Sequence, residues 1–358
     1  MQLSDFDYPF DPALIAVEPK SERDQSRLLV YHRKQDMIEH RDFRAILDYL
    51  NPADLLVLNN TRVFPARLTA TKENGGKIEC LFLRPILDTD AEQERSPLYW
   101  EVLVKGKSRP PVDLIFKGGV GGRILRDLEG GRKALRLCFP EERSPDVFAF
   151  FEACGEVPLP PYIMKRRDRK NPLSAADQGR YQTVYAEAWG SAAAPTAGLH
   201  FTENLIKAIR AKGVDTATTT LHIGLDTFLP IRTERIPDHK MHSEWYQVFE
   251  ETAAKIHQTR TNKGKVVAVG TTVTRALESA ARSDGIVRAA EGYTDIFIRP
   301  GHVFNGVDAL VTNFHLPKST LMVMITAFAG FEAVQKIYEE AVRERYRFYS
   351  YGDAMLIL

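Results

Sequence analysis

The sequence predicts an α+β protein in which a small all-β module interrupts a larger body of mixed helices and strands. The length of 358 residues suggests about two domains. Residues 63–150 consist of short strand-like runs separated by glycine pairs, whereas helix-like and strand-like runs alternate from residue 200 onward. We therefore divide the chain into a first part of the body (1–62), the inserted module (63–150) and a second part of the body (151–358).

The first part of the body contains two predicted strands and one predicted helix. Residues 27–31 and 54–59 are apolar enough for strands, and the unbroken apolar run of the second predicts burial on both faces. Residues 41–50 place their apolar side chains on one side of a helix. Polar residues 59–62 follow the second strand, at a place where ligand contacts are common.

The inserted module is predicted to be a small antiparallel barrel or sandwich. Its short strands alternate with glycine-rich turns, which is typical of both folds. A short helix at 147–153 leads out of it. The six predicted strands are residues 67–71, 78–83, 99–104, 113–116, 123–125 and 134–138.

The second part of the body begins with an extended, proline-rich crossing at 159–162 and a basic run at 165–170, expected in a loop. Helices and strands then alternate. The predicted helices are residues 203–212, 251–262, 273–281, 319–328 and 331–346. The predicted strands are residues 216–223, 265–270, 295–299, 307–313 and 354–358.

Composition limits the class of protein. The net charge of +1 means that any site for a polyanion must be a local patch. The three cysteines are far apart, which argues against a disulfide framework and fits a reducing cytosol. No apolar run reaches the ~18 residues of a membrane span, and the polar N-terminus is unlike a signal peptide. We expect a cytoplasmic protein without a membrane partner.

Residues 192–201 (AAAPTAGLHF) form a stretch that a ligand could approach closely. Its residues are mostly small, it contains Gly198, and it ends near His200. We expect a loop that leads into the N-terminus of the helix at 203–212, where free N–H groups carry partial positive charge. The alternative is a tight packing turn with a satisfied core histidine.

Histidines cluster in the same region. Four of the nine lie within residues 200–242, where an even distribution would place about one: His200, His222, His239 and His242. Histidine is the side chain best suited to proton transfer at neutral pH. The segment 238–244 contains two histidines and Glu244, but its spacing is not H-E-x-x-H and no cysteine supports it, so we expect no metal.

Two further segments suggest anion binding. Residues 266–272 read as a strand, a turn with Thr271 and Thr272, and a helix start, which could hold a carboxylate, phosphate or ribose; a simple capped helix is the alternative. The basic run, with Lys165, Arg166 and Arg167, could contact nucleic-acid phosphates, or be a solvated loop.

Motifs along the whole chain resemble the S-adenosylmethionine:tRNA ribosyltransferase-isomerase family of queuosine biosynthesis. Two departures from the family pattern are Asp226, in place of a glycine, and His302, in place of an aromatic residue. The inserted module matches least. The motifs are DLLVLNNT (54–61), PLPPYI (158–163), RYQTVY (180–185), AAPTAGLHF (193–201), TLH (220–222), HKMH (239–242), VGTT (269–272), DALVTNFHLP (308–317) and YGDAM (351–355).

The resemblance implies a barrel-like β body flanked by helices, with an inserted β domain. It also implies transfer and isomerisation of the ribosyl part of S-adenosylmethionine onto 7-aminomethyl-7-deazaguanine at the wobble position of a tRNA with a GUN anticodon. The product is epoxyqueuosine-tRNA, and adenine and methionine leave. S-adenosylmethionine is a co-substrate, and a metal-free monomer is expected.

This chemistry assigns roles to the candidate residues. The catalytic candidates, which would transfer protons, are His200, His222 and His315, with Glu244 as carboxylate partner. Gly198, Thr271 and Thr272 would hold the methionine carboxylate or the ribose. Asp308 and Asn313 would read the polar edges of adenine or the acceptor base, and Lys165, Arg166 and Arg167 would bind tRNA.

Two other classes of protein are alternatives to this assignment. An S-adenosylmethionine-dependent RNA methyltransferase would not release adenine, and the sequence lacks the glycine-rich loop of the doubly wound kind. A non-catalytic RNA-binding protein would need no histidine cluster and should have a larger basic excess than +1.

Overall fold

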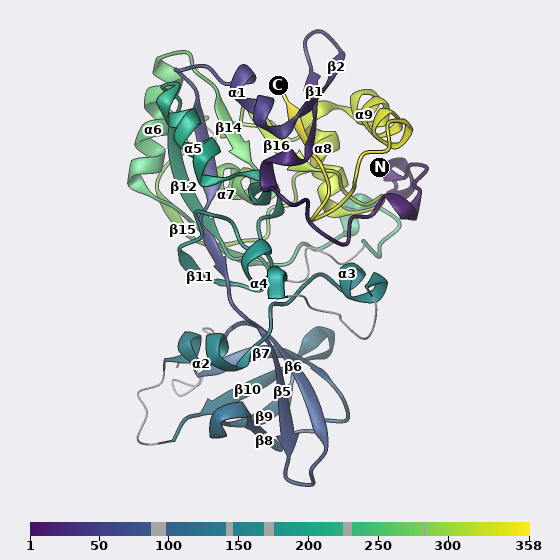
Figure 1. The fold of residues 1–358 in the computed structure, drawn as a ribbon, viewed down its shortest axis with the longest axis vertical. Coiled ribbons are helices and arrows are strands. Elements are labelled where there is room, and N and C mark those ends of the chain that lie inside the picture. The colour runs from purple at the N-terminus through teal and green to yellow at the C-terminus, as the bar shows by residue number, and fades with distance from the viewer. Residues whose placement is uncertain (87–97, 141–145, 168–174, 225–230, 283) are drawn as a thin grey trace.

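The α+β class is confirmed by the structure, a computed structural model that describes residues 1–86, 98–140, 146–167, 175–224, 231–282 and 284–358. Figure 1 shows a large α+β body above a smaller all-β domain, with α3 (Pro161–Arg166), α4 (Ala175–Arg180) and β11 (Ala188–Ser191) on the side of the body that faces that domain.

A nine-stranded mixed sheet forms the centre of the body. Its four central strands β12, β3, β14 and β16 are parallel, since β3 pairs in parallel with both β12 and β14, and β14 pairs in parallel with β16. In order across the sheet, the strands are β15 (Ala290–Thr294), β13 (Glu244–Val248), β12 (Asp215–Leu221), β3 (Leu55–Asn59), β14 (Val266–Val269), β16 (Ala309–Asn313), β17 (Ala354–Ile357), β1 (Arg27–His32) and β2 (Met37–Asp42).

Helices cover both faces of this sheet, which explains the unbroken apolar run of β3. Leu55 and Val57 pack in a core with α6 (Glu250–Thr261), α7 (Thr271–Ala280), α8 (Thr320–Ala329) and α9 (Phe331–Arg343). Leu56 and Leu58 pack in a second core with α1 (Ile46–Tyr49) and α5 (Glu203–Ala211). Successive strand side chains point to opposite faces, so a strand between two cores needs apolar residues at every position.

The smaller domain is a closed six-stranded antiparallel barrel, as predicted. Helix α2 (Val147–Cys154) packs Phe150 and Phe151 into the barrel core. The boundaries at 62/63 and 150/151 stay a prediction. In order around the barrel, the strands are β10 (Arg132–Cys138), β7 (Tyr99–Lys105), β6 (Lys77–Pro85), β5 (Arg67–Lys72), β8 (Val112–Phe116) and β9 (Gly121–Asp127). A short strand β4 (Thr61–Val63) pairs with β11 beside the connection to the barrel.

Four local predictions were wrong. The extended crossing expected at 159–162 ends at Pro160, because Pro161 and Tyr162 begin α3, where a proline fits the first helical position. The helix expected at 41–50 is reduced to a 3₁₀ turn and α1, because Arg41 and Asp42 pair with β1 as part of β2. The strand expected at 295–299 lies upstream as β15, because residues 290–294 pair with β13. Of the basic run expected in a loop, Lys165 and Arg166 form the last turn of α3; residues 168–170 lie outside the described residues.

Among the described residues, no single helix is long and apolar enough to cross a membrane. Helices α8 and α9 meet that test of length and composition only as a pair, and they are bent by 116° relative to each other.

Candidate active site at the carboxyl ends of four parallel strands

The polar motifs of the sequence meet at one edge of the central sheet. Strands β12, β3, β14 and β16 run in parallel, so their carboxyl ends lie together. His222 follows β12, Asn60 follows β3, the Gly270 turn follows β14, and Asn313 ends β16. In sheets of this kind, ligands bind outside the carboxyl ends of the strands. This edge is therefore the candidate active site.

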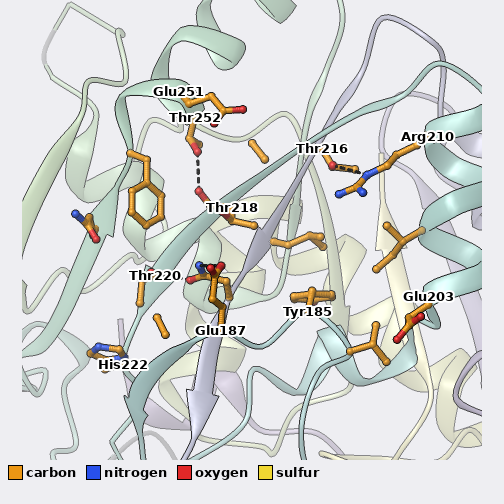
Figure 2. Close-up of a pocket in the computed structure, with 18 of the residues that line it drawn as sticks. Tyr185, Glu187, Glu203, Arg210, Thr216, Thr218, Thr220, His222, Glu251 and Thr252 are labelled. Atoms are coloured by element: carbon orange, nitrogen blue, oxygen red, sulfur yellow. Dashed lines mark hydrogen bonds between the residues drawn. The ribbon is translucent and has the colours of Figure 1, made fainter.

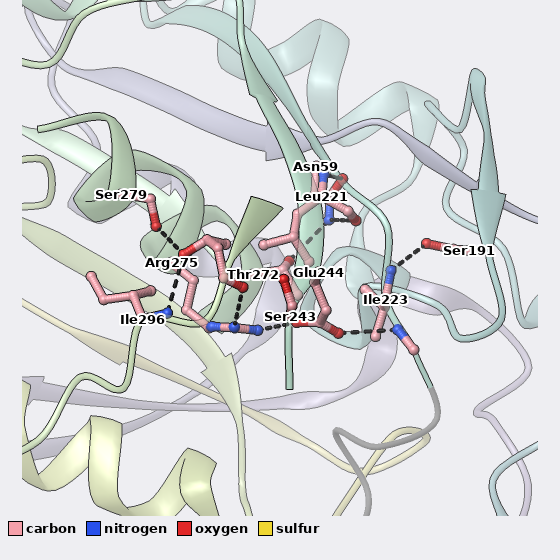
Figure 3. Close-up of polar contacts among 12 residues, drawn as sticks. Asn59, Ser191, Leu221, Ile223, Ser243, Glu244, Thr272, Arg275, Ser279 and Ile296 are labelled. Atoms are coloured by element: carbon pink, nitrogen blue, oxygen red, sulfur yellow. Dashed lines mark hydrogen bonds and ion pairs between the residues drawn. The ribbon is translucent and has the colours of Figure 1, made fainter. Parts of the chain in front are cut away.

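Asn59, which is fully buried at the end of β3, ties the neighbouring strands together. Its Nδ2 donates to the carbonyl oxygen of Leu221 at 3.0 Å and to Oγ1 of Thr272 at 3.1 Å. Figure 3 shows these contacts beside the segment that contains Ile223. A buried amide with its hydrogen bonds satisfied fixes the relative positions of the groups that it joins.

The AAAPTAGLHF segment crosses this edge from β12 to β16. The N–H of Ala192 donates to the carbonyl oxygen of Ile223 at 3.0 Å, and Oγ1 of Thr196 donates to Oδ1 of Asn313 at 3.1 Å. The segment then leads into α5, where the Thr202 hydroxyl accepts the N–H of Leu205 at 3.1 Å as the N-cap. The predicted helix after this segment is confirmed, but residues 196–200 form a buried 3₁₀ turn, which fits the alternative of a packing turn with a satisfied core histidine.

His222 lies just past the end of β12 with its ring held on two sides. Its Nδ1 is 2.9 Å from Oγ1 of Thr61, and its ring stacks on Trp245 with centroids 5.0 Å apart. Gly190 leaves room for the ring, because a Cβ there would lie 2.6 Å from ring atoms of His222. Burial lowers the pKa of His222 to about 4, so the imidazole is neutral at pH 7 and can accept a proton.

Glu244 and Arg275 form a buried ion pair next to His222. Arg275 projects from α7 and binds Glu244 at the start of β13; their side chains are 5% and 6% exposed (Figure 3). Glu244 also accepts the N–H of Gly224 at 3.0 Å. The pair thus joins α7, β13 and the backbone two residues after His222.

Two cavities adjoin this edge. The larger one, of about 790 Å³, runs along one face of β12 between α5 and α6. Figure 2 shows Thr216, Thr218 and Thr220 in a row along β12, with His222 at one end. The smaller cavity, of about 320 Å³, lies between the body and the barrel. His222 and Trp245 line both cavities.

The two other predicted catalytic histidines lie in separate buried networks. His200 is held between Ser26, whose Oγ is 2.7 Å from Nδ1, and Asn313, whose Nδ2 is 3.1 Å from Nε2. His315 Nε2 is 2.9 Å from Oγ1 of Thr312. Burial lowers the pKa of each to about 3, and the charges of Arg347 and Arg23 add to the effect on His200. Neither histidine lines the two cavities of this edge.

The predicted substrate-binding residues are divided between two ends of the sheet. Thr271 and Thr272 begin α7 at the carboxyl edge, and Thr272 accepts a hydrogen bond from Asn59. Gly198 packs against Tyr185, because a Cβ there would lie 2.1 Å from the phenol oxygen. Asp308 lies before β16, at its amino end, where Oδ2 accepts the N–H of Val266 at 2.8 Å. The structure therefore does not bring Asp308 together with the other candidates.

The predicted tRNA-binding residues differ in their surroundings. Lys165 and Arg166 are exposed, and Arg166 donates to the carbonyl oxygen of Pro12 at 2.7 Å. Arg167 is in a buried ion pair with Asp177 and also binds the carbonyl oxygen of Val17. Arg166 keeps an accessible charge, whereas that of Arg167 is paired inside the protein.

His239 and His302 line neither of the two cavities. His239 packs edge-on against Phe297, and His302 is 3.0 Å from Glu278. In the part of the chain that the structure describes, no group of three or more His, Cys, Asp or Glu residues could hold a metal ion. Asp226 lies outside the described residues.

Sequence reasoning missed Trp245, Gly190 and Arg275 at the edge. Arg275 is four residues after Thr271 on α7, so the two residues lie on the same side of that helix. This spacing could have identified Arg275 from the sequence. Trp245 and Gly190 had no local signal, because they reach His222 only through the pairing of distant strands.

Comparisons with known proteins agree with the resemblance of motifs along the whole chain. A sequence model of the family described as queuosine biosynthesis protein matches residues 3–357. Two relatives named S-adenosylmethionine:tRNA ribosyltransferase-isomerase are similar over the full length of both chains. The one from Symbiobacterium thermophilum is 48% identical, and the one from Pelotomaculum thermopropionicum is 49% identical.

A crystal structure of S-adenosylmethionine tRNA ribosyltransferase from Thermotoga maritima is similar in fold. It is 36% identical, with a TM-score of 0.54, and the match covers 99% of this chain and 100% of that one.

Proposed function

Because this chain belongs to the queuosine biosynthesis protein family, we propose that it is a transferase that acts on S-adenosylmethionine and tRNA. It transfers and isomerises the ribosyl group of S-adenosylmethionine onto 7-aminomethyl-7-deazaguanine at the wobble position, and epoxyqueuosine-tRNA, adenine and methionine are the products. The comparisons do not favour a methyltransferase.

The reaction requires several proton transfers in one site. The sulfonium group acidifies the ribose C5′–H, which a base must remove. Adenine leaves more easily when it is protonated, and the acceptor ammonium must lose a proton before its nitrogen can attack. A neutral imidazole close to both substrates can serve such steps.

His222 is our candidate for the proton-transfer residue that contacts the substrates. The observation that carries this assignment is that His222 lines both cavities at the carboxyl edge. No described residue hydrogen-bonds its Nε2, whereas Nδ1 is held by Thr61. Thr61 therefore orients the ring, and Nε2 remains for a substrate.

Glu244 supports this site through the backbone. Its carboxylate binds the N–H of Gly224 and the guanidinium of Arg275, so it fixes the segment that carries His222. The buried positions of His200 and His315 favour roles in shaping the edge; direct catalytic roles for them stay predictions. Substrate binding by Gly198, Thr271, Thr272 and Asn313 is part of the same proposal: Gly198 belongs to the crossing segment, Asn313 is held by Thr196 of that segment, and Thr271 and Thr272 begin α7.

The proposal extends to partners and setting. Exposed Lys165 and Arg166 would contact tRNA phosphates, since guanidinium and ammonium groups bind them readily. Recognition of a GUN anticodon, a monomeric state, a cytoplasmic location and independence of metal ions are parts of the same proposal.

The test is the rate of adenine release by His222→Gln. We expect a loss of about 10²–10⁴-fold in kcat, the usual contribution of a general acid or base. His257→Gln, at an exposed site on α6, is the matched control and should keep full activity. Turnover by His222→Gln at the wild-type rate would refute the assignment.

A further inference from the structure

The smaller cavity is built by both domains. Pro85 and Phe148 line it from the barrel side, and Trp189, Trp245 and Tyr293 line it from the body. Its volume of about 320 Å³ is at the lower end of the range for small-molecule sites, roughly 300–1,000 Å³. Such a cavity suits one ring system of a larger substrate.

Aromatic rings dominate its walls. Phe148 and Trp189 stack at 12° with centroids 5.5 Å apart, and His222 and Trp245 form a second stack. Tyr293 lies directly opposite Trp245 in the pairing of β13 with β15, so both side chains lie on the same face of the sheet. Tyr293 is nevertheless 51% exposed. An exposed tyrosine at the mouth of an aromatic cavity is suited to stack on a planar ligand.

Arginine side chains complete the barrel side of the cavity. Arg84 and Arg132 each bind Glu101, at distances of 3.0 to 3.1 Å, and all three residues line the cavity. Arg84 also donates to the carbonyl oxygen of Ser243 at 3.3 Å, which joins the barrel to the start of β13. Planar guanidinium groups beside aromatic rings are a common setting for nucleobases.

We propose that this interdomain cavity binds the 7-deazaguanine base of the wobble nucleotide, extruded from the anticodon loop and stacked on Tyr293 and the neighbouring rings. The inference rests on the proposed function and adds the place of its second substrate. Enzymes that modify a base place it in a pocket and hold it by stacking, and a base in a single-stranded loop is extruded at low cost.

The arrangement of the two cavities separates the two substrates. The reaction joins the amine of the base to the ribosyl group, so both substrates must meet at one point. His222 and Trp245 line both cavities and mark that point. The cavity of about 790 Å³ has room for S-adenosylmethionine, which leaves the smaller, aromatic one for the base.

The experiment compares binding affinities for two proteins and two tRNAs, and it needs no turnover. It measures the Kd of wild-type protein and of Tyr293→Ala for tRNA with the modified base and for the same tRNA with an abasic wobble position. For the wild-type protein, loss of the base should weaken binding roughly 5- to 150-fold, the equivalent of about 1–3 kcal/mol for one stacked base. For Tyr293→Ala, binding of the intact tRNA should be weakened and the further effect of the abasic site should be smaller.

One control variant and a second variant of the cavity accompany these measurements. Phe331→Ala removes another half-exposed aromatic residue, on α9, and should change neither Kd. Trp189→Leu, inside the cavity, should repeat the effect of Tyr293→Ala. The affinity for S-adenosylmethionine should stay at the wild-type value in Tyr293→Ala.

Two results would overturn the proposal. Weaker binding of S-adenosylmethionine with unchanged tRNA binding would mean that adenine occupies the cavity. Equal abasic penalties in the wild-type protein and in both cavity variants would mean that the base binds elsewhere. Either result could be obtained with an enzyme that still releases adenine, so the proposed function would stand. Failure of the wild-type protein to bind the modified tRNA or release adenine would instead refute that function.

Discussion

Acid should destabilise this protein through its buried histidines, and His200 gives the sharpest case. Burial and the charges of Arg347 and Arg23 lower its pKa from 6.5 to about 3. Between these two values the unfolded chain binds a proton that the folded chain does not. The free energy of unfolding is therefore undiminished above pH 6.5, falls as the pH decreases through 6.5, and stops falling near pH 3.

The size of the effect follows from the pKa difference. Each pH unit in this window costs about 1.4 kcal/mol for one such group. Between pH 7 and pH 5, His200 should therefore contribute a loss of about 2 kcal/mol. His200→Gln removes this contribution, although it also breaks the contacts with Ser26 and Asn313 and lowers stability at every pH.

Urea denaturation at pH 7 and pH 5 measures this difference. The loss of stability between the two pH values should be about 2 kcal/mol smaller in His200→Gln than in the wild-type protein. His257→Gln, which replaces an exposed histidine, should behave like the wild-type protein. An equal loss in His200→Gln and in the wild-type protein would refute the account of His200 as a neutral, buried side chain.

Three further predictions concern the edge and the surface. Arg275→Met should lower the free energy of unfolding by about 3–5 kcal/mol, because it removes the buried cation that pairs with Glu244. In urea denaturation, adding Glu244→Gln should recover part of the loss, and simple additivity would argue against the pair. Gly190→Ala should reduce kcat about 100-fold by displacing His222. The control is Gly292→Ala, which should keep full activity, because Gly292 has the same φ of 150° but a Cβ there would meet no atom within 4 Å. Equal activities of the two variants would contradict the close fit at Gly190. Arg166→Gln should weaken tRNA binding and reduce the slope of log K against log salt by about 1, and an unchanged slope would exclude a phosphate contact.

The sequence predicted the elements whose structure depends on residues that are close together in the chain. The apolar run of β3, the barrel strands with their glycine turns, and the helix expected at 203–212 follow from neighbouring residues, and these predictions are confirmed. His222 and Asn313 lie near the carboxyl ends of predicted strands, and Thr271 follows one. Their gathering at one edge could not be predicted, because it depends on the order and direction of four strands that are distant in the chain.

The errors have the same physical origin. Residues 41–42 have a helical pattern, but pairing with β1 provides their hydrogen bonds. No strand was predicted at residues 244–248, so Glu244 was interpreted as a carboxylate partner without Arg275. The catalytic role of His200 stays a prediction, but its motif did not show that both of its ring nitrogens are engaged inside the body. Long-range contacts decide such cases, and spacing in the sequence does not report them.

The central claim is ribosyl transfer to a modified base, and adenine release tests it most directly. The assay incubates the protein with S-adenosylmethionine and tRNA that carries either 7-aminomethyl-7-deazaguanine or guanine at the wobble position. We expect adenine and methionine with the modified tRNA and neither with the guanine tRNA. Formation of S-adenosylhomocysteine without adenine would contradict the claim and indicate methyl transfer.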